Sequence, residues 1–101
     1  MKILVSGIGG DIGFGVGKVL KNMPSVESIY GIDIHSNHPG VTLFSKCDVA
    51  PSCKDSHYIS WLEDYINFNQ IDLFIPTSEP EINFLSHKSI NKISNAKILI
   101  S

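Results

Sequence analysis

A short apolar segment that runs directly into closely spaced glycines opens the chain, and it limits the choice of fold more than any other feature. Residues 2–6 form a strand-like run, Gly7, Gly9 and Gly10 follow it, and apolar residues then recur at helical spacing over residues 12–22. A strand, a tight turn and a helix N-terminus in this order open a doubly wound α/β domain. Glycine admits positive φ and close backbone approach, and the first amides of a helix favour an anion. The segment predicts a ligand-facing turn, although a tight turn that binds nothing would use the same glycines.

Strand-like and helix-like segments alternate along the rest of the chain. We expect strands at residues 28–33, 46–49, 72–75 and 97–100, a turn-rich loop at residues 36–40, and helices at residues 55–69 and 79–88, the last able to continue to residue 93. Such alternation predicts a parallel sheet of about five strands with right-handed crossovers, in the order 3-2-1-4-5. In that order residues 7–13 and 76–81 follow neighbouring central strands and face one crevice.

The size and charge of the chain limit its class. The 101 residues have the length of one small domain, residues 1–101, and 43% of them are hydrophobic, which suffices for a core. The formal net charge is −2 and no basic stripe is present, so nucleic acid is not an expected partner. No segment has the pattern of a membrane span or a signal peptide, and we expect no membrane partner and a cytoplasmic setting.

Asp33 ends the second expected strand about twenty residues after the glycines, where an acidic side chain can bond the ribose of a dinucleotide. An aspartate at a strand end also simply starts a turn. The glycines fit G-x-x-G-x-x-G through Gly7, Gly10 and Gly13, and they miss the dinucleotide pattern because Ile12 stands where it needs a glycine. Ribose binding by Asp33 therefore stays one of two open interpretations.

The segment after the fourth expected strand carries polar residues at the mouth of the crevice. Ser78 and Glu81 have the S-x-x-E spacing of a capping box, and Pro80 suits a first helical turn. Glu79 is not needed for that box, so its carboxylate could accept hydrogen bonds from a substrate amine or hydroxyl. We count Thr77, Ser78 and Glu79 as candidate ligand contacts, together with the glycine turn and Asp33.

Neither a metal site nor a catalytic arrangement is predicted. The possible ligands His35, His38, Cys47, Cys53 and His57 have spacings that match no common zinc signature. The two cysteines do not make a disulfide framework, and no Ser-His-Asp or Cys-His arrangement can be argued.

With these residues in view, the chain resembles the N-terminal, pre-ATP-grasp domain of ATP-grasp proteins, and most of all relatives of the carbamoyl-phosphate synthetase large chain. The resemblance covers essentially the whole chain. It rests on residues 2–13 (KILVSGIGGDIG), 29–33 (IYGID), 57–62 (HYISWL) and 71–81 (IDLFIPTSEPE), of which the last is the most specific. It implies a three-layer Rossmann-like α/β domain.

The resemblance also implies a function. ATP-grasp enzymes use Mg-ATP to activate a carboxylate as an acyl phosphate, which an amine or another nucleophile then attacks. Their N-terminal domain forms one wall of the active cleft and helps to hold the acceptor substrate, here through the backbone of residues 7–10 and Glu79. Because the ATP-binding apparatus belongs to later domains, we expect a piece of a larger ligase that binds no cofactor and is inactive alone. Its expected partners are the ATP-grasp domains and a small carboxylate or amine substrate.

Two other interpretations stay open. One is the NAD(P)-binding part of an extended short-chain dehydrogenase or epimerase. Residues 5–13 fit the opening of that family well, and Asp33 would suit NAD as its cofactor. Against it, the segment after the fourth strand lacks the small residues and histidine usual there, and the Tyr-x-x-x-Lys pair is absent. The other interpretation is a binding or assembly module without chemistry.

Self-association is a further expectation. If later domains normally cover the last helix and strand, the chain by itself should expose apolar surface there, and such surfaces find partners. The residues concerned are Phe84, Leu85, Ile90, Ile93, Ile98 and Leu99.

Overall fold

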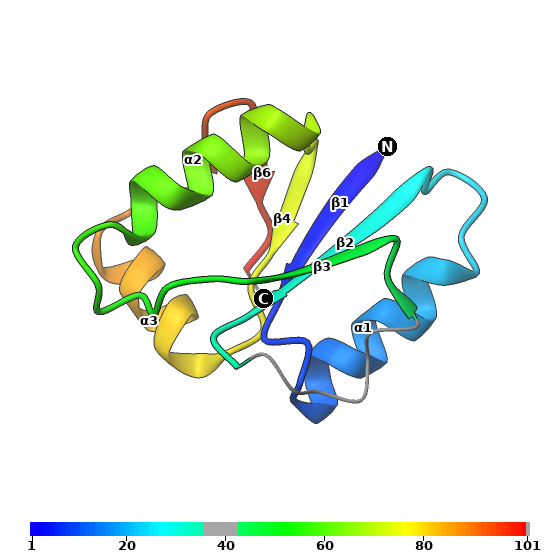
Figure 1. Ribbon diagram of the computed structural model, residues 1–101, viewed down its shortest axis with the longest axis horizontal. Helices are drawn as coiled ribbons and strands as arrows, with labels where there is room; N and C mark the ends of the chain where they lie inside the picture. The colour runs from blue at the N-terminus through cyan, green and yellow to red at the C-terminus, as the bar shows by residue number, and fades with distance from the viewer. Residues whose placement is uncertain (36–42, 101) are drawn as a thin grey trace.

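The computed structural model describes residues 1–35 and 43–100 and shows three layers, with a sheet between two layers of helices (Figure 1). The strands are β1 (Lys2–Ser6), β2 (Ser28–Asp33), β3 (Lys46–Val49), β4 (Leu73–Ile75), β5 (Lys92–Ile93) and β6 (Ala96–Ile98), and the helices are α1 (Asp11–Lys21), α2 (Tyr58–Asn69) and α3 (Glu79–His87). Helix α1 covers one face of the sheet, and α2 and α3 cover the other (Figure 1). The predicted α/β class is therefore confirmed; the loop expected at residues 36–40 lies outside the described residues.

The central strand β1 separates two hydrophobic clusters. It pairs in parallel with β2 on one side and with β4 on the other. Because successive side chains of a strand point to opposite faces, Ile3 and Val5 pack in the cluster on the α1 side, and Leu4 packs with Phe74 on the side of α2 and α3. The apolar runs of β1 and β4 are thus those of strands covered on both faces.

The sheet has one strand more than expected. The last expected strand, residues 97–100, is β6 at Ala96–Ile98, and it pairs in parallel with β4. The additional strand β5 pairs antiparallel with β6, so the order 3-2-1-4-5 becomes β3-β2-β1-β4-β6-β5. A two-residue turn joins these strands, in which Ser94 has a φ of 53°. The predicted order is correct up to this hairpin, which no local pattern in the sequence indicated.

Helix α3 ends at His87 and does not continue to residue 93. Ser89 has a left-handed φ of 55°. The Ile90 amide donates to the Leu85 carbonyl at 2.9 Å and the Ser89 amide to the Ser86 carbonyl at 3.1 Å. These two bonds make a Schellman motif, which stops a helix and turns the chain. The turn frees residues 92–93 to form β5.

The hairpin changes the apolar surface expected near the last helix. Leu85 and Ile93 are buried in the core cluster, and Phe84, Ile90 and Ile98 are half-buried against it. The expected exposure of Leu85 and Ile93 is therefore wrong, because the chain closes over its own core here. Leu99 remains exposed.

Self-association stays a prediction, with Leu99 and the two-residue β5 edge as the remaining contact surface on this side. We expect light scattering over a concentration series to show a mass that rises toward that of a dimer. A constant monomer mass at the highest concentration would show that the small exposed surface is insufficient.

Candidate functional site

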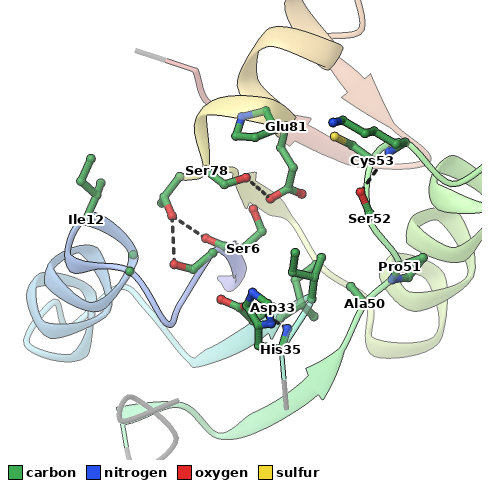
Figure 2. A pocket seen from close by; sticks show the side chains of 18 of the residues that line it. Ser6, Ile12, Asp33, His35, Ala50, Pro51, Ser52, Cys53, Ser78 and Glu81 are labelled. Atoms are coloured by element: carbon green, nitrogen blue, oxygen red, sulfur yellow. Dashed lines mark hydrogen bonds between the residues drawn. The ribbon is translucent and has the colours of Figure 1, made fainter. Parts of the chain in front are cut away.

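A cleft with a volume of about 670 Å³ lies at the carboxyl ends of four parallel strands (Figure 2). Its walls come from the turn between β1 and α1, from the residues that follow β2 and β3, and from the segment between β4 and the first turn of α3. The carboxyl edge of an open parallel sheet, where neighbouring crossovers go to opposite faces, is the usual ligand position in such folds. The predicted convergence of residues 7–13 and 76–81 on one crevice is confirmed.

Close backbone packing explains two of the glycines. Gly7 has a φ of +68°, and a Cβ placed on it would lie 2.7 Å from Thr77 Oγ1. A Cβ on Gly13 would lie 2.3 Å from the Gly7 carbonyl oxygen. The Gly10 amide donates to the same oxygen at 3.1 Å and closes the turn. The first turn of α1 can therefore approach the end of β1 only if residues 7 and 13 have no side chain.

Thr77 joins the ends of the two central strands. Its Oγ1 donates to the Ser6 carbonyl at 2.6 Å and lies 3.4 Å from the Gly7 carbonyl oxygen. Thr77 lines the cleft, as expected, but its hydroxyl proton is engaged within the protein. The hydroxyl fixes the distance between the cleft walls that follow β1 and β4.

Asp33 ties the glycine turn to the end of β2. The Gly9 amide donates to its Oδ2 at 2.9 Å, and the His35 amide donates to its Oδ1 at 3.0 Å. The residue is 9% exposed and lies in the cleft lining. Each carboxylate oxygen therefore already accepts a backbone amide, which is the turn-forming role expected as one of the two interpretations.

The expected contact residues divide into two groups. Gly7, Gly10, Asp33, Thr77 and Ser78 lie in the cleft lining. Gly9 and Glu79 lie outside it: the Gly9 amide is turned to Asp33, and Glu79 is exposed at the first position of α3.

Glu81, which the S-x-x-E spacing assigns to helix capping, lies in the cleft lining (Figure 2). Ser78 precedes α3, but its side chain makes no capping bond to the backbone. Its hydroxyl donates instead to Glu81 Oε1 at 2.8 Å, and the hydroxyl of Tyr58 donates to Glu81 Oε2. The S-x-x-E spacing brings Ser78 and Glu81 together, as the capping box predicts. The hydrogen bond joins the two side chains to each other, whereas in a capping box each side chain bonds a backbone amide.

Tyr58 reaches Glu81 from the buried side of α2 and is 1% exposed. Burial, followed by the neighbouring Glu81 carboxylate, raises the pKa of the Tyr58 hydroxyl well above its usual value. The hydroxyl therefore keeps its proton and stays a hydrogen-bond donor to Glu81. This partner comes from 23 residues earlier in the chain, and no local pattern indicates it.

Ser6 is the last residue of β1 and is 2% exposed, yet its Oγ has no hydrogen-bond partner among the described residues. It lies in the cleft lining. A buried hydroxyl without a partner costs about 1–3 kcal/mol. Most buried polar groups are paired, so an exception that faces a cleft indicates a place for a ligand atom or a water.

No metal centre is found in the described part of the chain, where no group of three or more His, Cys, Asp or Glu residues is arranged to hold an ion. His38, one of the residues weighed as a zinc ligand, lies outside it. Within the same residues, no helix has the length and apolar character needed to cross a membrane.

Comparison with known proteins supports the fold. No protein-family model matches the chain, and no curated protein matches its sequence. Among solved structures, it is similar to glycinamide-RNase-transformylase T from Mycobacterium tuberculosis, with a TM-score of 0.68 and 11% identity over 97% of this chain and 28% of that one. It is also similar to dTDP-glucose 4,6-dehydratase from Bacillus anthracis, solved in complex with NAD, with a TM-score of 0.59 and 18% identity over 97% of this chain and 36% of that one. At these identities the likeness shows a Rossmann-like fold, and the chain spans about a third of each protein.

Proposed function

We propose that this chain is the substrate-side domain of a cytoplasmic ATP-grasp ligase similar to the large chain of carbamoyl-phosphate synthetase, and that it is inactive alone. The observation that carries the proposal is the cleft wall at the start of α3, where Tyr58 and Ser78 hold the Glu81 carboxylate in place beside the end of β4. A carboxylate fixed in this way can orient the amine or hydroxyl of an acceptor substrate. In such ligases Mg-ATP supplies the activated acyl phosphate, and other domains would bind it.

The alternative is an NAD(P)-binding domain of a dehydrogenase or epimerase. It has support from the similar fold of a dehydratase solved with NAD. Asp33 does not weigh against it, because its carboxylate keeps about two lone-pair sites after it accepts the Gly9 and His35 amides. Against it stands the segment after β4, which lacks the small residues and the histidine that are usual there in that family.

Calorimetric titration of the chain with NAD, NADP and Mg-ATP tests this choice. We expect no tight binding of any of the three, since the nucleotide-binding apparatus of an ATP-grasp ligase lies in other domains. A dissociation constant in the low micromolar range, about −8 kcal/mol, would contradict the expectation. Tight NAD binding would favour the dehydrogenase alternative. The proposed activity itself is tested in a longer protein that contains this chain, as release of ADP that requires both a carboxylate and an amine.

A further inference from the structure

We propose that Glu81 and Ser6 form a subsite that binds a primary ammonium group of the acceptor substrate. This inference rests on the proposed function and names the substrate class for its cleft. It differs from the expectation drawn from the sequence, which placed such a contact at Glu79.

Glu81 is the cleft carboxylate whose position is fixed by side-chain donors from two elements. Tyr58 from α2 and Ser78 from the start of α3 each donate to a different oxygen of the carboxylate. A carboxylate has about four lone-pair sites, so two of them remain available after these bonds. Because Tyr58 is buried, the carboxylate cannot turn away from the cleft without breaking that bond. The acceptor is therefore in place before a ligand arrives.

Ser6 supplies the second acceptor. Ser6 belongs to the lining of the same cleft, and its buried Oγ has no partner in the described part of the chain. Figure 2 shows the Ser6 side chain pointing to the side of the cleft where Ser78 and Glu81 lie. An ammonium group carries several donors, so one such group can bond a carboxylate oxygen and a hydroxyl oxygen together. The bond to Glu81 would be charge-assisted, and hence among the stronger ones.

The charges around the cleft favour a cation over an anion. Three carboxylates line it, from Asp11, Asp33 and Glu81, against one lysine, Lys54, and the exposed His35. The N-terminus of α1 would attract an anion on its own, but Asp11 in its first turn already places a negative charge there. A phosphate or carboxylate at the Glu81 side would meet repulsion, whereas an ammonium group would not.

Amide-resolved NMR titration of the 101-residue chain with ethylammonium chloride tests the inference. We expect saturable shifts at the amides of Ser6, Ser78 and Glu81, with weaker effects of ethanol, sodium acetate and sodium phosphate at matched ionic strength. Glu81→Gln should weaken ethylammonium binding by about tenfold, because it replaces a charge-assisted bond by a neutral one. Glu79→Gln removes the same charge from the same helix turn outside the cleft, and should leave binding within about twofold of the parent chain.

Ser6→Ala provides an independent measurement should Glu81→Gln disturb folding, and it should weaken binding by about threefold or more. The inference fails if acetate or phosphate binds these residues more tightly than ethylammonium. It also fails if folded Glu81→Gln and Ser6→Ala both bind ethylammonium like the parent chain. Amine binding without Mg-ATP-dependent ligation in the longer protein would contradict the proposed function alone. Ligation without amine binding at these residues would contradict this inference alone.

Discussion

Replacement of Gly13 by alanine is expected to lower the free energy of unfolding by about 3 kcal/mol. A Cβ at this position would lie 2.3 Å from the Gly7 carbonyl oxygen and 2.9 Å from Thr77 Oγ1. Backbone cannot give way like the end of a flexible side chain, so α1 must move away from the end of β1. Urea unfolding followed by far-UV circular dichroism measures the loss, and the same shift should disturb the cleft.

Gly15 provides the matched control in the same helix. A Cβ there would meet nothing within 4 Å, so Gly15→Ala should only improve helix propensity and raise the free energy of unfolding by up to about 1 kcal/mol. Equal effects of the two substitutions would contradict the tight packing of the glycine turn.

Truncation of Leu85 to alanine is the second substitution with a large expected effect, a loss of about 3 kcal/mol. Leu85 is 0% exposed and lies in the same core cluster as Phe74 and Leu62. Leu99→Ala, at a residue that is 55% exposed, should change the free energy of unfolding by less than about 0.5 kcal/mol. The comparison, measured by thermal and urea unfolding, tests whether the chain closes its own core beneath α3. A small effect at Leu85 would restore the expectation that this side is open.

The sequence predicted the central part of the fold well because its signals are local. The apolar runs of β1 and β4 and the periodicity of the helices place most elements within a few residues of their positions in the structure. The end of α3 was predicted to within one residue, but its possible continuation to residue 93 is wrong and the β5 hairpin was missed, because Ser89 and Ser94 adopt left-handed backbone conformations without being glycine. Nothing in a serine indicates positive φ, since the tertiary packing of the hairpin stabilises it.

The candidate site was predictable in its location and less so in its residues. The topology of a parallel sheet brings the two loops together, so the cleft followed from the order of the strands. The choice between Glu79 and Glu81 depends on Tyr58, a donor from another helix, which local spacing does not reveal. Ser6 was hidden for a different reason, because it ends an apolar strand and reads as part of the core.

The bond between Thr77 and the Ser6 carbonyl joins residues 71 positions apart, and this separation has a consequence for synthesis. While the chain leaves the ribosome, β1 can pair with β2 early, but its other edge stays without a partner until β4 has emerged. Contacts between segments so far apart form late, because a long loop must close first. During that interval an apolar strand edge is open to the wrong neighbours, which is the situation that holding chaperones relieve. The cleft can thus assemble only after β4 and the start of α3 have emerged.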